Sequence, residues 1–303
     1  MEYQEFVREI CRQVQSRAGE ERSVSVRPLM RNNSVVRDSL CIRSHGDQAV
    51  PAVCLDDCYA DYCSGTPTED ITDRILRIYE GGRRGDEFDF SFFTDGRRAS
   101  SRIVGRIVGR RDNERLLQQA PHRDFLDLAV IYYYLMEAMS DSMAGILIRH
   151  EHLALWDMDV DELDHLAVTN THHLLPPAFR TMGDILGELG TTSGDFDLKE
   201  MMEEAMPPIC LYVLTNSLKC HGSVYMADPN VLSHVQMMLE EDYYILPSSV
   251  HECIILPDSM ARDAGELTEM VREINRTQVA PEERLSDSVY HYSSGEGLQI
   301  ASE

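Results

Sequence analysis

Residues 243–258 read YYILPSSVHECIILPD, and this segment constrains the fold more than any other part of the chain. Two apolar runs rich in Ile, Leu and Tyr flank a short polar stretch, and such residues favour extended strands. Pro247 fixes its own φ, and serine hydroxyls bond readily to nearby backbone groups, which is typical of a turn. The segment therefore predicts two strands joined by a turn in the C-terminal third.

The remaining sequence alternates strand-like and helical patterns. Further strands are predicted at 23–31, 39–45, 49–55, 102–110, 125–136, 145–155, 208–216, 223–227 and 288–294. Helices are predicted at 2–17, after Thr66, and at 162–170, 181–190, 229–239 and 266–279. The last third thus reads β-β-α-β-β-α-β. We expect an α+β fold with mixed sheets built from repeated strand-strand-helix modules.

Three modules are expected along the chain. Residues 81–96 are rich in glycine and charge, which favours a hinge or boundary. We place an N-terminal α/β module at 1–95, a middle module at 96–194 and a C-terminal β-β-α-β-β-α-β module at 195–303.

The charge of the chain is unevenly distributed. The formal net charge is −24, and residues 121–303 carry 32 acids against 9 bases, or −23 of it. Such a surface repels phosphate backbones, so no nucleic-acid partner is expected. The excess serves solubility, or it meets a basic protein partner, or it mimics DNA.

Location follows from composition. No apolar run approaches the ~20 residues that a membrane span needs. The amphipathic, acidic N-terminus differs from a signal peptide. Eight cysteines at irregular spacing favour reduced, buried thiols. We expect a cytoplasmic protein with no membrane partner.

Several segments resemble a known family. CLYVLTN at 210–216, YYILPSSVHE at 243–252 and MVREINRTQVAPEERLSDSVYHY at 270–292 are similar to a bacterial family catalogued only as a domain of unknown function. PHRDFLDLAVIYYYL at 121–135 and HLALWDMDVDELDHLAVTN at 152–170 also fit that family, and the strand layout is similar to a second such family. The resemblance implies no activity, ligand or catalytic residue, and it supports the fold and the intracellular location.

The PSSVHE segment contains the first candidate site, formed by Ser248, Ser249, His251 and Glu252. A hydrolase needs a nucleophile, a base and an acid within hydrogen-bond reach. Alternation along a strand puts His251 and Cys253 on one face and Glu252 on the other, and same-face neighbours are ~6.6 Å apart. No catalytic residue is predicted. These four residues are weak candidates for a site, and the alternative interpretation of the segment is a structural turn.

Metal and anion sites have weaker support. His150, His152, His172 and His173, or Cys54, Cys58 and Cys63, offer ligand types without a recognisable metal-binding spacing, so neither a metal nor a cofactor is predicted. Arg102, Arg106 and Arg110 are weak candidates for binding an anion, because guanidinium groups suit carboxylates and phosphates.

Three functions remain open. The leading hypothesis is a non-enzymatic interaction or regulatory module whose acidic C-terminal region meets a protein partner. The alternative is a hydrolase centred on Ser248, Ser249 and His251. The third is an acidic protein that mimics DNA, which predicts carboxylates at phosphate-like spacing on one face.

Overall fold

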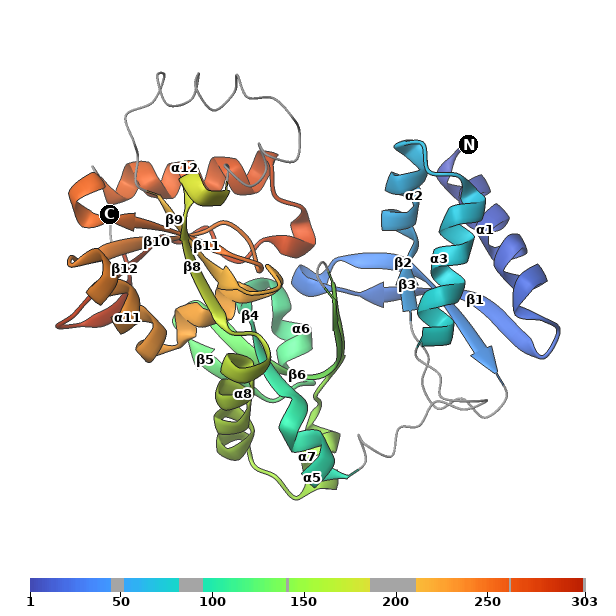
Figure 1. Ribbon diagram of the computed structural model, residues 1–303, viewed down its shortest axis with the longest axis horizontal. Helices are drawn as coiled ribbons and strands as arrows, with labels where there is room; N and C mark the ends of the chain where they lie inside the picture. The colour runs from blue at the N-terminus through green and yellow to red at the C-terminus, as the bar shows by residue number, and fades with distance from the viewer. Residues whose placement is uncertain (45–51, 82–94, 140–141, 186–210, 262, 302–303) are drawn as a thin grey trace. The chain divides into compact units, whose positions relative to one another are not determined.

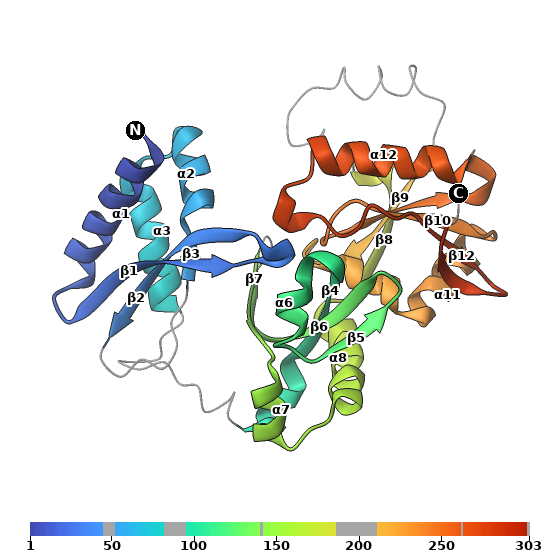
Figure 2. The same ribbon diagram turned by 180° about the vertical axis from the view of Figure 1, so that it is seen from behind.

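The structure is a computed structural model that describes residues 1–44, 52–81, 95–139, 142–185, 211–261 and 263–301. The chain divides into two compact units, residues 1–92 and 93–303. Figures 1 and 2 show the first in blue to cyan and the second in green to red. The expected boundary between a middle and a C-terminal module, at 194/195, lies outside the described residues.

In the described residues of the unit 1–92, three α-helices pack with a three-stranded antiparallel sheet. The strands pair in the order β1-β2-β3, with Arg22 opposite Ser44 at one end of the β1–β2 ladder. The elements are α1 (Tyr3–Ala18), β1 (Arg22–Met30), η1 (Asn32–Ser34), β2 (Val36–Ser44), β3 (Ala52–Cys54), α2 (Leu55–Cys63) and α3 (Thr68–Gly81). The two helices and three strands expected in this part of the chain are therefore present, and α2 is an additional helix that was not expected.

The core of this unit follows from helical periodicity. Phe6, Ile10 and Val14 recur every four residues along α1, and all three are fully buried. They pack with Ile71 and Ile75 of α3, which share the same spacing. The unit therefore holds together by one apolar cluster between its helices and sheet.

The unit 93–303 contains two antiparallel sheets. Its strands are β4 (Ile103–Gly109), β5 (His122–Phe125), β6 (Leu128–Met139), β7 (Ser142–Leu147), β8 (Pro177–Thr181), β9 (Tyr212–Asn216), β10 (Tyr243–Pro247), β11 (Cys253–Pro257), β12 (Tyr290–Ser293) and β13 (Gly297–Ile300). Its α-helices are α5 (Gly96–Ala99), α6 (Glu114–Leu117), α7 (His150–Trp156), α8 (Val160–Leu174), α11 (Pro229–Leu239) and α12 (Ala264–Thr277). Short 3-10 helices are η2 (Ser100–Arg102), η3 (Arg111–Asn113), η4 (Gly222–Ala227), η5 (Asp258–Met260) and η6 (Pro281–Glu283).

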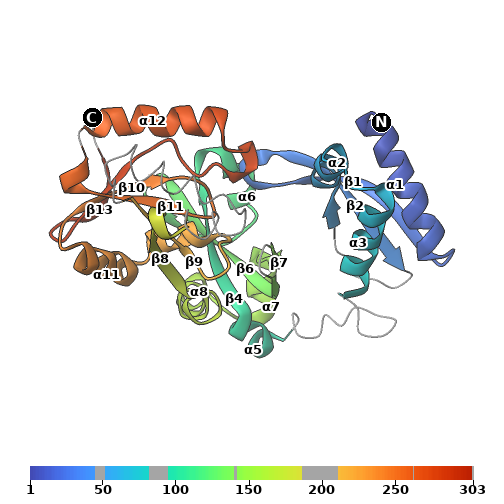
Figure 3. The same cartoon turned by 45° about the horizontal axis from the view of Figure 1, so that its top comes forward.

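The larger sheet has the order β13-β12-β10-β11-β9-β8, and helices cover both of its faces. Alternation along β10 sends Tyr243 and Ile245 toward α11 and Leu246 toward Val271 of α12. Figures 1 and 3 show these two helices on opposite sides of the sheet. Residues 243–257, which form β10 and β11, thus lie at the centre of this sheet. Pro247 is opposite Cys253 at the turn end of the β10–β11 ladder.

The smaller sheet has the order β4-β6-β5, and β7 pairs with the far end of β6. Ile103 on one face of β4 packs against Leu163 and Ala167 of α8. Ile107 and Leu128 join the core of the larger sheet, so the two sheets share buried contacts. Segments from both sheets therefore meet inside this unit.

The α+β class is confirmed, but two local predictions were wrong. Residues 223–227 form the 3-10 helix η4 and not a strand, because Ser223, Tyr225 and Met226 are all buried and the Asp228 N–H bonds back to Tyr225. The predicted strand 145–155 ends at Leu147, and α7 begins at His150. The helix predicted at 181–190 begins at residue 182, directly after the unpredicted strand β8, and its residues 186–190 lie outside the described residues.

Candidate functional site

The Ser249–His251 turn joins β10 to β11. The Ser249 hydroxyl accepts a hydrogen bond of 3.0 Å from the backbone N–H of His251, and the Ser249 N–H donates to the Glu252 carbonyl. Among the described residues, no hydrogen bond links the hydroxyl of Ser248 or Ser249 to the His251 ring. The acid nearest that ring is Glu283, whose Oε1 is 3.7 Å from Nε2. The serine side chain therefore stabilises the turn, and Glu252 is not the partner of His251.

Cys253, next to this turn, is not an activated nucleophile. Its side chain is fully buried, and burial raises the pKa of the Cys253 thiol to about 12. The thiolate is the reactive form of cysteine, so this sulfur stays unreactive near neutral pH.

A second loop, residues 217–221, brings another histidine to the turn. Lys219 and His221 have φ values of 53° and 57°, in the left-handed region that non-glycine residues rarely adopt. Asn216 holds the loop: its Nδ2 donates to the Cys220 carbonyl at 2.7 Å, and its Oδ1 accepts from the Cys220 N–H at 3.2 Å. The buried Asn216 side chain thus fixes where Cys220 and His221 lie.

The loop and the turn are joined through the backbone of His251. The carbonyl oxygen of His251 accepts from the Gly222 N–H at 2.9 Å and from the Thr215 hydroxyl at 2.8 Å. The His221 N–H donates to His251 Nδ1 at 3.2 Å, and the two rings lie 5.1 Å apart. There is no room for a side chain at Gly222, because its Cβ would lie 2.6 Å from the backbone nitrogen of Asn216.

These contacts gather three potential metal ligands. One ligand atom each from Cys220, His221 and His251 lies within 4.8 Å of the others. Cys220 is buried, whereas the two imidazoles are partly exposed. Among the described residues, this is the one group of three or more histidine, cysteine or carboxylate side chains whose ligand atoms are close enough to hold a metal ion.

Arg106 lies beside this group. Its Nε and Nη2 atoms are shielded from solvent and have no hydrogen-bond partner among the described residues, while its Cζ lies 3.9 Å from the centre of the Tyr133 ring. Burial lowers the pKa of the Arg106 guanidinium. Burial, together with the charges of Arg106 and His251, also lowers the pKa of His221 well below its ordinary value. His221 is therefore a neutral imidazole at pH 7.

The other two arginines of the predicted anion site have different partners. Arg102 donates to the carbonyl oxygens of Leu135 and Met136, at 2.6 and 2.9 Å. Arg110 is exposed and pairs with Asp124 at 3.3 Å. Arg106 is therefore the member of the predicted set with donors left for a ligand.

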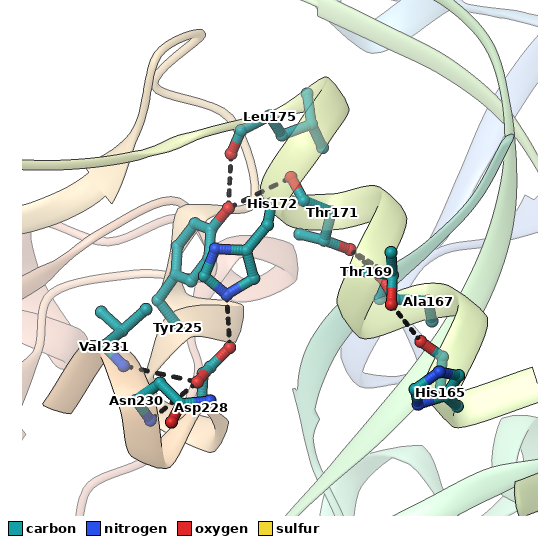
Figure 4. A network of polar contacts seen from close by, with 11 residues as sticks. His165, Ala167, Thr169, Thr171, His172, Leu175, Tyr225, Asp228, Asn230 and Val231 are labelled. Carbon is teal, nitrogen blue, oxygen red and sulfur yellow. Dashed lines mark hydrogen bonds and ion pairs between the residues drawn. The ribbon is translucent and has the colours of Figure 1, made fainter. Parts of the chain in front are cut away.

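A second polar network joins α8 to η4 and α11 (Figure 4). His172 Nε2 lies 2.5 Å from Asp228 Oδ2, and Asp228 Oδ1 accepts from the N–H groups of Asn230 and Val231 at the start of α11. The Tyr225 hydroxyl lies 2.5 Å from the Leu175 carbonyl oxygen. Burial raises the pKa of Tyr225, so its hydroxyl remains a donor.

This network borders a cavity of about 30 Å³ lined by Gly105, Asp164, Thr171, His172 and Tyr225 among others. A water molecule needs roughly 10–15 Å³ of such space, so the cavity fits one or two waters and no organic substrate. Asp164 is held by the Tyr132 hydroxyl at 2.8 Å and by Arg123. We therefore interpret the network as a connection between elements.

The remaining ligand candidates lie apart from the loop cluster. His152 Nδ1 accepts from the Arg149 N–H at the start of α7, and burial lowers the pKa of His152. Cys54 and Cys58 are buried while Cys63 is exposed, and burial raises the pKa of Cys54 and Cys58. In the part of the chain that the structure describes, neither these cysteines nor His150, His152 and His173 form a group with metal-binding geometry.

Sequence reasoning missed Cys220 and His221. They lie in LTNSLKCHG, where the only local indication is a cysteine and a histidine side by side next to a glycine. His251 and Arg106 were weak candidates for other chemistries. The four residues come together only through the pairing of β9 with β11 and the contact of η4 with β4.

Comparisons with known proteins add the family. No described helix is both long and apolar enough to cross a bilayer. No curated protein and no solved structure matches the chain. Residues 3–294 match the family of unknown function DUF5688, and the chain belongs to this family.

Proposed function

We propose that the protein is a non-enzymatic interaction or regulatory module that binds a basic protein partner through an acidic edge of residues 93–303. We define this acidic edge by Met237, Met238, Glu240, Glu241, Asp242, Asp258 and Met260. The edge forms where the end of α11 and the start of β10 meet η5, at one end of the larger sheet.

Two segments far apart in sequence build this surface. Glu241 accepts hydrogen bonds from the N–H and the hydroxyl of Ser259, at 2.8 and 2.9 Å. The Asp258 N–H donates to the Asp242 carbonyl at 3.0 Å. These bonds fix the two segments, and the edge is therefore a preformed surface, which lowers the entropy cost of binding.

The carboxylates of the edge keep their charge available. Asp242 accepts from the amide of Gln236 at 2.7 Å, and Glu241 accepts from Ser259, so the donors are neutral. Among the described residues, no lysine or arginine forms an ion pair with these carboxylates, and Asp258 pairs with the imidazole of His291. An uncompensated negative surface attracts a basic partner and steers its approach.

Exposed methionines supply the apolar part of the surface, and this is the observation that carries the proposal. Met237 and Met238 are 66% and 55% exposed, and Met260 is 41% exposed, beside the carboxylates. Flexible thioether side chains are common at binding surfaces that adapt to their partners. A surface that combines them with carboxylates suits a basic segment with apolar residues.

Three further observations, two from the sequence and one from the structure, support the proposal. Irregularly spaced cysteines support a cytoplasmic setting, where thiols stay reduced. The charge of −23 over residues 121–303 supports a protein partner and opposes a nucleic-acid partner. Ser249, engaged in its turn, supports a role without hydrolysis.

The proposal is tested by affinity capture from a lysate of the protein's own host at low and high salt. The edge variant carries Met237→Ser, Met238→Ser and Glu240→Asn; asparagine tolerates the left-handed φ of 61° at residue 240. The matched control carries Leu155→Ser, Asp161→Asn and Glu162→Gln, which are exposed positions on α7 and α8. We expect a basic protein that the wild type and the control retain, that the edge variant loses, and that salt releases.

Equal capture by all three chains, or no specific capture by the wild type, would contradict the proposal. Release of the captured protein by short duplex DNA would identify a DNA-binding partner and favour mimicry of DNA over general recognition of basic segments.

A further inference from the structure

We propose that Cys220, His221 and His251 form a binding site for a transition-metal ion, with zinc the best match. The thiol sulfur and one nitrogen of each ring lie within 4.8 Å of one another. Thiolate sulfur and imidazole nitrogen are ligands that zinc prefers, at about 2.3 and 2.0 Å. Tetrahedral geometry then separates the ligands by roughly 3.3–3.6 Å, which small side-chain rotations achieve. The site is independent of the acidic edge.

The backbone around these residues favours a built site over a chance cluster. Left-handed φ values at Lys219 and His221 cost energy, and such conformations persist only where the surroundings hold them. Asn216 holds the Cys220 backbone on both sides, and the close approach at Gly222 brings the loop against the turn. The result of this arrangement is that His221 faces His251.

Arg106 provides the second, independent observation. Its Nε and Nη2 are shielded from solvent and have no partner among the described residues, and guanidinium donors in such a place are unfavourable unless anionic groups approach them. A zinc-bound Cys220 is a thiolate, which accepts hydrogen bonds from such donors. One thiolate and two imidazoles leave a fourth position on zinc, and water or a small anion would occupy it. The side chain of His251 is 31% exposed, so solvent reaches the group.

Metal binding has a specific consequence for His251. Its Nδ1 accepts the His221 N–H at 3.2 Å, so in the neutral ring the proton is on Nε2. Coordination through Nδ1 takes the lone pair that accepts this bond. Coordination through Nε2 moves the ring proton to Nδ1. Either mode breaks the hydrogen bond, and the His221 amide resonance shifts when zinc is added.

The test measures zinc affinity of the full chain by competition with a chromophoric chelator, in excess Mg²⁺ to occupy surface carboxylates. We expect one tightly bound Zn²⁺ per chain. Cys220→Ser, His221→Asn and His251→Gln each remove a ligand and weaken binding by more than about 100-fold, since even loss of an outer-shell partner costs 10–100-fold. Asparagine keeps the left-handed φ of residue 221 accessible. The matched controls, His234→Gln and Cys63→Ser, alter exposed residues and leave the affinity unchanged.

Cobalt gives a readout that separates this site from binding to carboxylates. Co²⁺ bound to the wild type should produce a thiolate-to-metal charge-transfer absorption, and Cys220→Ser should abolish it. The absence of that absorption, or zinc binding that all three ligand variants share with the wild type, overturns the proposal. If Cys220→Ser does not fold, His221→Asn and His251→Gln decide, because their side chains are partly exposed. The metal-site proposal can be confirmed while the acidic-edge proposal is contradicted, and the reverse is also possible.

Discussion

The units 1–92 and 93–303 differ in where charged side chains lie. In the first, charged groups pair on the surface, as Arg74 does with Asp61 at 2.5 Å with both side chains 42% exposed. In the second, Nε and Nη2 of Arg106 are shielded from solvent and have no hydrogen-bond partner among the described residues, whereas the fully buried Ser39 and Thr72 of the first unit are neutral. The second unit also holds 35 acidic against 16 basic residues, compared with 17 and 12 in the first.

Apolar packing and surface ion pairs account for the first unit. In the second unit, packing alone does not account for the shielded donors of Arg106. Natural proteins break local rules mostly at functional sites, where the cost is tolerated. Left-handed His221, the unpaired donors of Arg106 and the exposed methionines of the acidic edge all lie in 93–303. Both proposed binding sites therefore lie in this unit.

The largest expected effects test whether the two units are independent. Ile75→Ala and Ile245→Ala each remove a fully buried side chain, from the first and the second core. Each variant should lose about 4 kcal/mol of unfolding free energy, within the usual range for such truncations. Scanning calorimetry of the full chain should show two transitions, with each variant lowering only its own. A single transition that both variants lower equally would break the comparison.

Gly222→Ala tests the close contact inside the second unit. The added Cβ would lie 2.5 Å from Thr215 Oγ1 and 2.6 Å from Thr215 Cα, and backbone cannot move aside cheaply. We expect a loss of about 3 kcal/mol in urea unfolding, at the upper end for overpacking. Gly295→Ala is the matched control, because nothing lies within 4 Å of its Cβ position. Equal stability of the two variants would show that the loop is not held as described.

Exchanging an arginine for methionine sharpens the contrast in polar pairing. Arg106→Met should stabilise the metal-free protein by about 1 kcal/mol, because it removes a charged group whose Nε and Nη2 are shielded from solvent and have no hydrogen-bond partner among the described residues. Arg74→Met should cost up to about 1 kcal/mol, since a surface pair contributes little. Urea unfolding measures both. A destabilised Arg106→Met would mean that the guanidinium has a structural role.

The smallest effect concerns a surface carboxylate of the first unit. Hydrogen bonds from Arg12 and Gln13 lower the pKa of Glu9 to about 2. A depressed carboxyl pKa contributes stability at pH above the ordinary value of 4.5, and this contribution is lost as pH falls toward 2. NMR titration should report the low pKa in the wild type and a rise toward 4.5 in Arg12→Gln. An unchanged pKa would exclude the pairing.

Local patterns predicted much of the fold and little of the candidate site. Periodicity placed α1, α8 and α12, and the paired apolar runs placed β10 and β11, because burial of one face is a local property. The short η4 segment was wrong because it is enclosed on several sides, so strand-like composition does not decide its conformation. His221 meets His251, and Arg106 lies near His221, only through tertiary contacts between three distant segments, which no local pattern encodes.

The most direct test of metal binding confined to the unit 93–303 is calorimetry of the full chain with Zn²⁺ added. The variants Ile75→Ala and Ile245→Ala assign the two transitions. We expect zinc to raise the unfolding temperature of 93–303 only. The unfolding free energy of this unit should increase by about 2.7 kcal/mol when free zinc is 100 times the dissociation constant. His221→Asn should remove the rise and His234→Gln should keep it. A rise of both transitions, or of neither, would contradict the assignment of binding to the second unit.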